Sequence, residues 1–456
     1  MAGCFWRIRE DSPFNRIFLP SPAEEGRLGE MFLFELKRTV KFIDDPFVTG
    51  YLDAIGQRIS VQAQEQPFPF HFYILADPRI NAFAGPAGQI FITAGLAGEA
   101  NNESELAGVL SHEIAHVARR HIARMIQQQQ GMALPTIAGI MAGMMVPNPQ
   151  AGQAIIAGTI AGVESVALGY TRLDEEEADQ YGIGYLSRAG YDPHGIIRFL
   201  GRLVKEEGIE SGTLAPYLET HPPLIQRIGY LESLSPPASR AAINLVGSDR
   251  LKLIQAKLIA EYKEINVARG YFDEKLKSDP KNPDLHFGLG LLYQRQKMWG
   301  EALAELGKAL DLSGPNAQIL WELGNVYLPK GDFDSAAASF SQATELDSKN
   351  KSLFLALGQA YHEAKKPEPA IKALESAIAL DHDLVDACYE LGIVYGEMEK
   401  YGQAHYYLGR SYFLIGDLEN ARFHFHKALE FYDPESPDAK KIKEEMEKIK
   451  GGKWGR

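Results

Sequence analysis

Cysteine is almost absent from this chain of 456 residues, which has only Cys4 and Cys388. Two cysteines near opposite ends of a chain allow at most one disulfide bridge, and they cannot form the CxxC pair typical of a structural zinc site. The sequence therefore excludes a disulfide-stabilised scaffold. It leaves the redox compartment open.

A signal peptide is also missing from the sequence. Roughly the first thirty residues carry charges throughout and lack an apolar run of about 7–15 residues. The sequence thus indicates either a cytosolic protein or one whose leader has been removed. The start Met-Ala-Gly-Cys4 resembles the end of a bacterial lipoprotein cleavage site, so lipidation of Cys4 and a cloning remnant are both open interpretations.

Clusters of Lys and Arg are not found, and the net charge is -13. Because phosphate binding depends on clustered basic side chains, we do not expect nucleic acid as a partner. Apolar residues make up 45% of the chain and charged residues 23%, which is the balance of a globular protein with a buried core.

No apolar run is long enough to span a bilayer. Residues 132–169 are rich in Ala, Gly, Met and Ile, but Pro147 and Pro149 split them into two pieces of about fifteen residues, short of the ~20 that a spanning helix needs. Three interpretations remain for this segment: a buried helical hairpin, a mobile lid, or a flap that contacts a membrane.

The first hundred or so residues combine helical and strand patterns. A helical pattern covers 27–59, and short runs rich in β-branched and aromatic residues at 70–75 and 89–93 predict strands. A turn-rich segment, 81–88, separates the two runs. We expect a small sheet here, next to helices.

Two further helices are predicted between residues 102 and 188. The first begins at Asn102, with Glu105 completing a capping box, and ends at Gly131. The second begins at Thr171 or Asp174 and ends near Arg188, before a glycine and a proline that cannot continue it.

Beyond residue 250 the chain repeats with a period of 34 residues. Four columns keep this step: Gly290, Gly324, Gly358 and Gly392; Tyr293, Tyr327, Tyr361 and Tyr395; Ala302, Ala336, Ala370 and Ala404; and Ala309, Ala343 and Ala377. This period, with small residues where paired helices cross, predicts tetratricopeptide repeats. Ala268 indicates a degenerate half-repeat before the array, and Gly409, only 17 residues after Gly392, indicates an altered cap at its end.

The segment His112-Glu-Ile-Ala-His116 lies in the middle of the predicted helix from Asn102. Residues four apart share one helix face, so both histidines can direct a ring nitrogen at one metal ion, with Glu113 beside it. Zinc favours such ligands, and the glutamate can accept a proton from attacking water. A chance match between two surface histidines and an acid is the alternative.

A third ligand is required, and two candidates can be compared. His121 follows His116 by five residues, whereas the metzincin pattern requires a histidine six residues after it and a glycine three after it. We therefore expect His121 to support the site or cap a helix. The acid-rich segment 174–179 offers a carboxylate from a second helix, although acids at a helix N-terminus also stabilise the helix dipole.

Four ordered motifs resemble a known family. These are NAFAGPAGQIFITAGL, HEIAHVARRH, YTRLDEEEADQYG and ETHPPLIQR, and the resemblance that they carry covers roughly residues 25–235. The sequence resembles the gluzincin peptidases that include HtpX and the CAAX prenyl endopeptidases. With its repeats it is most similar to the bacterial periplasmic proteases of outer-membrane β-barrel assembly quality control.

The resemblance implies roles for seven residues. It implies that His112, His116 and Glu175 bind one zinc ion per chain, that Glu113 is the base, and that Asp179 orients a ligand histidine. His221 is implied to approach the zinc, and Arg227 to contact an oxyanion or carbonyl. Thr171 departs from the family, which commonly has Ser there, but both residues can cap a helix.

The resemblance also bears on substrate and location. The transmembrane helices of the membrane-embedded relatives are not evident here, which suggests an enzyme that works beside a membrane, in the bacterial periplasm or cell envelope. We expect a protein substrate to add as an extended segment alongside the 89–93 strand. We also expect His221 to act as a plug, because a neutral imidazole can occupy the zinc position that water needs. The alternative is that His221 only packs beside Pro222 and Pro223 and stabilises a turn.

Together these features predict an α+β zincin-like metallopeptidase domain, mainly helical with a small sheet, followed by an all-α tetratricopeptide-repeat solenoid. We expect an N-terminal extension at 1–24, the peptidase domain at 25–245, the repeats at 250–435 and a C-terminal helix or tail at 436–456. The predicted function is zinc-dependent cleavage of misfolded or misassembled envelope proteins, with the repeats docking substrate or assembly partners. The alternative is a chaperone or adaptor whose zinc site is silent or autoinhibited; a cytosolic scaffold would require that no leader was ever present.

Overall fold

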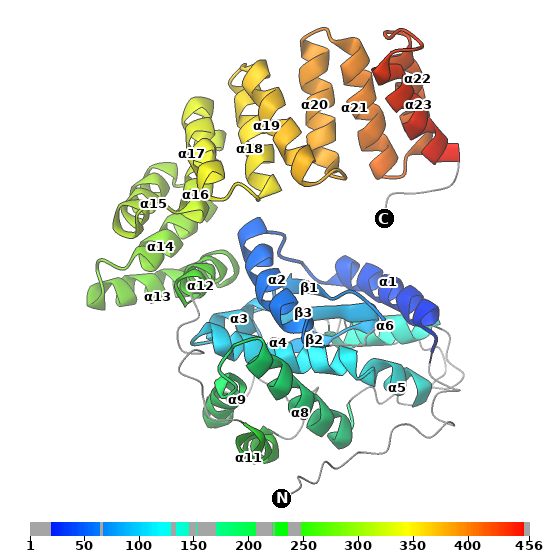
Figure 1. The fold of residues 1–456 in the computed structure, drawn as a ribbon. Coiled ribbons are helices and arrows are strands. Elements are labelled where there is room, and N and C mark those ends of the chain that lie inside the picture. The colour runs from blue at the N-terminus through cyan, green and yellow to red at the C-terminus, as the bar shows by residue number, and fades with distance from the viewer. Residues whose placement is uncertain are drawn as a thin grey trace, which may run out of the picture. The chain divides into compact units, whose positions relative to one another are not determined.

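The computed structural model describes residues 20–63, 67–128, 134–145, 152, 170–206, 221, 224–235 and 248–450. The chain divides into two compact units, Met1–Glu264 and Ile265–Arg456. The first contains a three-stranded sheet with helices, and the second is entirely helical (Figure 1). An α+β domain followed by an all-α repeat unit was predicted, and this fold class is confirmed.

The elements of the first unit are α1 (Pro22–Thr39), α2 (Pro46–Ser60), β1 (His71–Leu75), β2 (Ala82–Ala84), the 3-10 turn η1 (Pro86–Gly88), β3 (Gln89–Thr93), α3 (Ala94–Glu99), α4 (Glu103–Ala118), α5 (His121–Gln128), α6 (Leu134–Met145), α8 (Arg172–Arg188), α9 (Gly195–Glu206), α11 (Leu224–Leu234) and α12 (Ser248–Tyr262). The predicted helical pattern at 27–59 is thus two helices. Asp45 caps the second through its side chain, and Pro46 opens it.

The sheet has the strand order β1-β3-β2. Both predicted strands are present, and β3 pairs parallel with β1 and antiparallel with β2. The strand β2 was not predicted, because Ala82-Phe-Ala84 lies in a segment of turn-forming composition and acquires strand structure by pairing with β3. Among the described residues β3 is therefore the central strand, and β2 is an edge strand.

This order corrects the expected substrate position. We predicted that substrate would add alongside 89–93, but residues Gln89–Thr93 pair with β1 across their whole length, and Ile90–Ile92 pair with β2 on the other side. A strand with both edges paired has no free backbone groups for a third partner. Among the described strands, β2 pairs with β3 on one side only.

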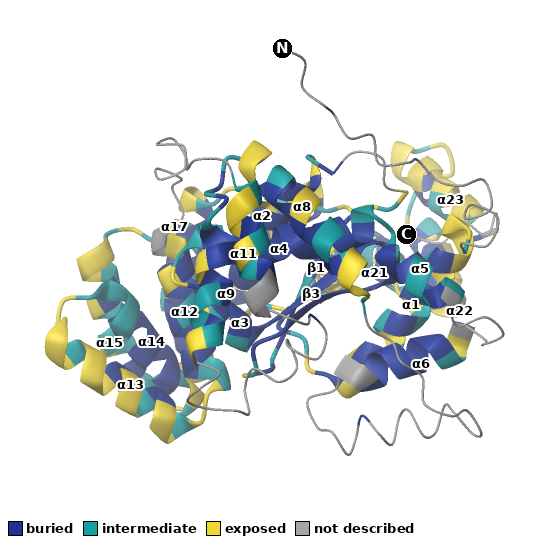
Figure 2. Cartoon of the chain, turned by 90° about the horizontal axis from the view of Figure 1, so that it is seen from below, coloured by how far each residue is buried: buried dark blue, intermediate teal, exposed yellow. Residues whose placement is uncertain are grey.

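Helix α4 is buried along most of its length, and Figure 2 shows it in dark blue. Asn102 caps it as predicted, accepting a hydrogen bond from the backbone N–H of Glu105. The predicted capping box is not formed, because the carboxylate of Glu105 accepts from the backbone N–H of Asn101, at 2.8 Å, and not from that of Asn102. The prediction that this helix continues to Gly131 is wrong, because α4 ends at Ala118 and Arg120 adopts a left-handed φ of 55°. An ion pair of 2.7 Å between Arg120 and Glu25 of α1 holds this turn, which lacks the usual glycine.

Helix α8 matches its prediction. Thr171 and Asp174 form a capping box at its start, and Gly190 with a φ of +85° follows its end. The helix crosses α4 closely at Gly182, where an added Cβ would lie 3.1 Å from the carbonyl oxygen of Ser111 and 3.2 Å from Cα of His112. This close crossing brings the two helices that carry the acidic and histidine motifs together.

Part of the apolar segment 132–169 is helix α6, which packs on α1. Its residues Ile137–Ala142 are buried. This part therefore behaves as core. The remaining residues of the segment, apart from residue 152, lie outside the described part of the chain, so the lid and membrane-flap interpretations stay predictions for them.

Helix α12, which we assigned to the repeats, packs in the first unit. The side-chain amide of Gln255 donates to the carbonyl oxygens of Ala97, Gly98 and Ala100, at 3.0, 3.3 and 2.6 Å. Buried Lys257 forms an ion pair of 2.7 Å with Asp45 at the start of α2. These contacts explain why the division falls after Glu264 and not near residue 250.

The second unit contains α13 (Ile265–Ser278), α14 (Pro283–Arg295), α15 (Trp299–Ser313), α16 (Ala317–Tyr327), the turn η3 (Leu328–Lys330), α17 (Phe333–Leu346), α18 (Lys351–Glu363), α19 (Pro367–Leu380), α20 (Val385–Glu397), α21 (Tyr401–Leu414), α22 (Leu418–Leu429) and α23 (Pro437–Lys450). Helix α13 carries Ala268 and packs on α14 as the predicted half-repeat.

The glycine column marks the helix crossings of the repeats. A Cβ added at Gly324 would lie 2.5 Å from the ring of Phe340, and one added at Gly358 would lie 2.5 Å from Cγ of Leu374. Gly409 meets Phe425 in the same way, at 2.7 Å, so α21 pairs with α22 in a register shifted by half a repeat. The 34-residue period therefore reports the close approach of paired helices.

Among the described helices, none combines the length and apolar character that crossing a bilayer requires.

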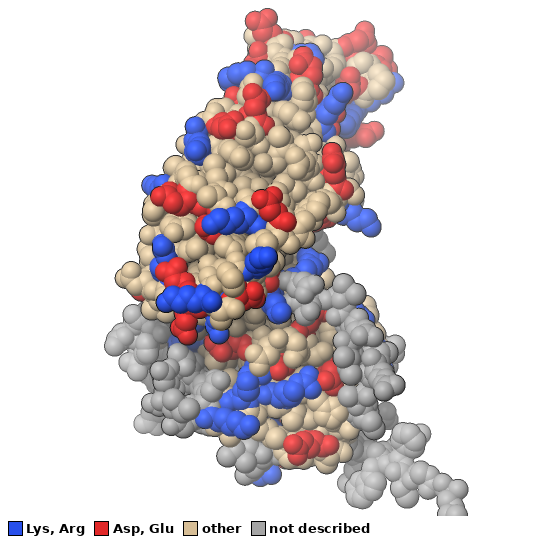
Figure 3. Space-filling model, turned by 90° about the vertical axis from the view of Figure 1, so that its left-hand side faces the viewer, with Lys and Arg blue, Asp and Glu red and all other residues tan. Residues whose placement is uncertain are grey.

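On the face seen in Figure 3, acidic and basic side chains are interspersed over the repeats.

Candidate metal centre

Helix α4 places three side chains of the HEIAH segment in the interior. His112, Glu113 and His116 are all buried. The Nε2 atoms of the two histidines lie 3.0 Å apart, as expected for residues separated by one helical turn on one face. The local spacing alone produces this pair.

Helix α8 adds two carboxylates to the same interior. Glu175 places Oε2 3.5 Å from Nε2 of His112 and Oε1 3.4 Å from Nε2 of His116. Asp179, one turn later on α8, places Oδ1 2.9 Å from Nδ1 of His112. Both carboxylates are buried, so α8 supplies two acids to a site that water does not reach freely.

His221 and Arg227 come from the segment around α11. His221 is buried, with Nδ1 2.9 Å from Oε1 of Glu175 and Nε2 3.4 Å from Oε1 of Glu113. Arg227 donates from Nε and Nη2 to the two carboxylate oxygens of Asp179, at 2.9 and 2.7 Å. All seven residues singled out from the sequence therefore meet in one buried cluster.

The ligand set can be compared with what zinc requires. Tetrahedral zinc with bonds of ~2.0–2.2 Å separates its ligand atoms by about 3.3–3.6 Å. The three atom pairs among His112, His116 and Glu175 measure 3.0, 3.5 and 3.4 Å. Ligand atoms of these three residues and of His221 all lie within 4.8 Å of one another. Two imidazoles and a carboxylate at these distances fit a divalent ion such as zinc.

Glu113 differs from its neighbours in its contacts. Within the described residues, neither of its buried carboxylate oxygens has a hydrogen-bond partner. Burial raises its pKa, against the opposing effect of His221 and His112. A buried carboxylate with a raised pKa is suited to accept a proton.

The pKa values of His112 and His116, the two histidines of the HEIAH segment, shift in opposite directions. Burial sets the pKa of His116 well below its ordinary value, although Glu175 opposes this. Burial also disfavours charge on His112, but Asp179 and Glu175 outweigh burial and the repulsion of Arg227, so the pKa of His112 rises to about 9. The difference follows from Asp179, which contacts His112 directly.

Two further residues contact His116: Tyr170, which was not predicted from the sequence, and His121, which was expected to support the site or to cap a helix. The ring of Tyr170 stacks on the ring of His116, with centroids 3.8 Å apart. Nδ1 of His121 lies 2.9 Å from Nδ1 of His116, and Nε2 of His121 lies 3.1 Å from Oε2 of Glu177. Tyr170 stands directly before the cap of α8, so its contact depends on where the preceding chain runs and no local pattern signals it.

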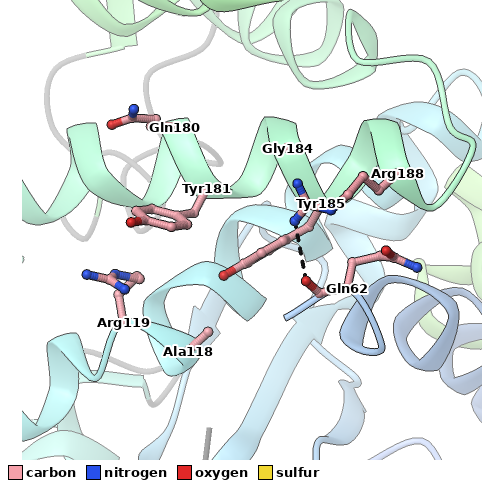
Figure 4. Close-up of a pocket in the computed structure, with 8 residues that line it drawn as sticks. All are labelled: Gln62, Ala118, Arg119, Gln180, Tyr181, Gly184, Tyr185 and Arg188. Atoms are coloured by element: carbon pink, nitrogen blue, oxygen red, sulfur yellow. Dashed lines mark hydrogen bonds between the residues drawn. The ribbon is translucent and has the colours of Figure 1, made fainter. Parts of the chain in front are cut away.

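A polar pocket lies on the outer side of α8 and at the C-terminal end of α4. Figure 4 shows that Arg119 and Tyr181 line one part of it and that Tyr185, Arg188 and Gln62 line another. Arg119 lies over the ring of Tyr181, 4.4 Å from its centroid, and also donates to Glu177 at 2.6 Å. None of the seven residues of the cluster lines this pocket. Arg119, which does line it, also binds Glu177 of α8.

The buried cluster has the residue types that a metallopeptidase site requires, and comparison with known families gives a match of the same kind. Residues 46–235 match the model of peptidase family M48. Three further matches, at residues 324–365, 352–383 and 402–433, are to tetratricopeptide repeats. The chain thus carries a peptidase family M48 domain followed by tetratricopeptide repeats, which confirms the resemblance seen in the motifs. The match at 402–433 shows that the predicted altered cap includes a repeat in shifted register.

Curated relatives share this domain. The "beta-barrel assembly-enhancing protease" of Yersinia pestis is 36% identical over 201 residues, which cover 44% of this chain and 41% of that protein. A "putative beta-barrel assembly-enhancing protease" of Vibrio cholerae is 34% identical over 280 residues, covering 60% of this chain and 57% of that protein. The chain therefore spans about half the length of these relatives.

More distant proteins are similar to single parts of the chain. The "mitochondrial metalloendopeptidase OMA1" of Schizosaccharomyces pombe is 28% identical over 190 residues, covering 42% of this chain and 54% of that protein. Among solved structures, YrrB, described as a TPR protein, has 21% identity and a TM-score of 0.34, covering 38% of this chain and 89% of that one.

Proposed function

We propose that this chain is a zinc-dependent endopeptidase that hydrolyses peptide bonds at the α4–α8 cluster. The observation that carries the proposal is the convergence of three side chains beside the buried carboxylate of Glu113. The Nε2 atoms of His112 and His116 lie 3.0 Å apart, and each lies 3.4 to 3.5 Å from one of the two carboxylate oxygens of Glu175. Zinc, when bound, supplies the Lewis acidity that polarises a carbonyl and the attacking water.

Three side chains of the cluster would have separate roles in the hydrolysis of a peptide bond. Glu113 accepts the proton of the attacking water, and its raised pKa lets it pass that proton to the leaving amine. Asp179 accepts a hydrogen bond from Nδ1–H of His112 and so leaves the lone pair on Nε2 of that ring for a metal ion. Arg227 holds Asp179 with two hydrogen bonds, and its positive charge lies near the place where an oxyanion would develop.

A protein substrate would bind as an extended segment along the edge of β2 that does not pair with β3. This strand packs on α4, and the carbonyl oxygen of Ala82 lies 3.4 Å from Nε2 of His221, inside the cluster. Main-chain hydrogen bonds to an edge strand hold a peptide with little regard to its sequence. This is the binding mode expected of an enzyme that degrades misfolded proteins.

For the biological role, we propose cleavage of misfolded or misassembled proteins of the bacterial cell envelope, in the periplasm. The names of the Yersinia and Vibrio relatives, each a protease linked to β-barrel assembly, support this substrate class. The tetratricopeptide repeats would dock the substrate or the assembly machinery, since stacked helix pairs present extended surfaces for protein ligands.

An autoinhibited state of the same site also has structural support. His221 contributes a fourth ligand atom within the cluster, and its Nδ1 contacts Glu175 at 2.9 Å. An imidazole there would compete with water for the fourth ligand position of zinc. In that state the repeats could act as an adaptor while the peptidase remains silent.

One experiment tests the proposal. Zinc content and casein cleavage are measured for the wild type, for Glu113→Gln and for Glu103→Gln, a control on the first turn of the same helix. We expect zinc in all three and cleavage only in the wild type and the control, because a base is not a ligand. Wild-type protein without zinc, or an active Glu113→Gln variant, would overturn the proposed mechanism.

A further inference from the structure

The contact between His116 and His121 is unusual because it joins two imidazoles through the same kind of nitrogen. Both residues are buried, and their Nδ1 atoms lie 2.9 Å apart. His121 is the first residue of α5, placed there by the turn at Arg120. Its ring reaches back to α4, while its other nitrogen contacts Glu177 on α8 at 3.1 Å.

The positions of the protons follow from metal binding by His116. Its Nε2 atom faces His112 and Glu175, so this nitrogen must keep a lone pair to act as a ligand. The Nδ1 atom of a neutral ring then carries the proton and donates it. His121 must accept through Nδ1, and its own proton therefore sits on Nε2, where it donates to Glu177. One arrangement of protons satisfies both contacts.

Two arginines fix the carboxylate at the end of this chain of contacts. Arg119, at the end of α4, donates to Oε1 of Glu177 at 2.6 Å, and Arg124, on α5, donates to Oε2 at 2.6 Å. Figure 4 shows Arg119 beside Tyr181, at the edge of the polar pocket. Because the two cations approach from both sides of the α4–α5 break, Glu177 stays ionised and in place as an acceptor.

His112, the other proposed ligand histidine, also has a carboxylate that an arginine holds, but it contacts that carboxylate directly. Nδ1 of His112 contacts Asp179 directly at 2.9 Å, and Arg227 holds that carboxylate. For His116, an imidazole stands between the ligand ring and its carboxylate. A carboxylate that orients a ligand histidine raises its basicity and fixes its tautomer.

We propose that His121 is a positioning residue which, together with Glu177, fixes the tautomer and ring orientation of His116 for metal binding. The inference rests on the proposed metal site and extends it to a relay of two hydrogen bonds, from His116 to His121 and from His121 to Glu177. It predicts that the relay, and not the bulk of the His121 side chain, determines how tightly the protein holds zinc.

The test measures the zinc dissociation constant of the full-length protein by competition with a chromogenic chelator. His121→Leu replaces the imidazole with an apolar side chain of comparable size, which cannot accept a hydrogen bond from His116. We therefore expect zinc binding to weaken by about 10–100-fold. His121→Gln retains an acceptor and a donor and should recover most of the affinity. His194→Leu serves as control, since His194 contacts Asp192 at 3.2 Å in the same unit.

The thermal unfolding temperature of the zinc-free proteins separates positioning from folding. Equal values for His121→Leu and His121→Gln, with different zinc affinities, would support the relay. Wild-type zinc affinity in His121→Leu would overturn it while leaving the peptidase proposal intact. Equally weak binding by the Leu and Gln variants would also overturn it, because the acceptor would then not matter. If the wild type itself binds no zinc, the proposed metal site fails and the relay fails with it.

Discussion

Oδ1 of Asp179 lies 2.9 Å from Nδ1 of His112, and Arg227 holds the same carboxylate with two hydrogen bonds. Asp179→Ala removes the acceptor and leaves a buried guanidinium without this partner. We expect zinc affinity to fall by about 10–100-fold, measured by chelator competition. Asp179→Asn keeps an acceptor oxygen, so its zinc affinity should lie between those of the wild type and Asp179→Ala. Unchanged affinity in Asp179→Ala would show that this contact does not orient His112.

Glu175 is the third proposed ligand, and its replacement tests that role directly. In Glu175→Gln a neutral amide replaces the carboxylate near the two histidines, so we expect the purified protein to retain much less than one zinc per chain by elemental analysis. Glu176→Gln is the matched control, since Glu176 is the next residue on α8 and pairs with Arg172 near the surface. Normal zinc content in Glu175→Gln would place the third ligand elsewhere.

His221→Ala tests whether the imidazole at the cluster blocks the site. If His221 occupies the fourth position, its removal should raise cleavage of an unstructured peptide at saturating zinc on the order of tenfold, or ~1.4 kcal/mol. The measurement is the initial rate alongside zinc content. Lost cleavage with zinc retained would instead make His221 a donor to the transition state and exclude autoinhibition.

The boundary after Glu264 gives a prediction for truncated proteins. A chain ending at residue 264 keeps the contacts of Gln255 and Lys257, so it should cleave a short peptide at the full-length rate but bind a large protein partner more weakly. A chain ending at residue 249 loses α12 and exposes its apolar contacts, and it should unfold at a lower temperature. Equal partner affinity of full-length protein and the 264 truncation would remove the docking role.

Two glycines of the repeat unit, Gly358 in the glycine column and Gly307 outside it, give stability predictions of opposite sign. An added Cβ at Gly358 would lie 2.5 Å from Cγ of buried Leu374, so Gly358→Ala should destabilise the repeat unit by ~1–3 kcal/mol. At Gly307, inside α15, nothing lies within 4 Å, so Gly307→Ala should stabilise it by about 0.5–1 kcal/mol. Urea unfolding of both variants checks the two signs.

Local spacing was enough to predict several parts of this protein. His112 and His116 share a helix face because four residues make about one turn, whatever surrounds the helix. The repeats were predicted for a similar reason, since a glycine at each close crossing recurs at the period of the helix pair. Thr171 as a helix cap also depends only on its immediate neighbours.

The tertiary structure decided what comes together. Whether Glu175 or another acid of α8 faces the histidines depends on the crossing of α4 and α8 at Gly182, which no local pattern encodes. The end of α4 at Ala118 depends on an ion pair between Arg120 and Glu25, 95 positions apart in the chain. The strand β2 exists by pairing with β3. These features depend on contacts between segments that are distant in the sequence, and such contacts form only when the chain has folded. The contacts of His121 with His116 and Glu177 join three helices in the same way, so their geometry could be recognised only in the structure.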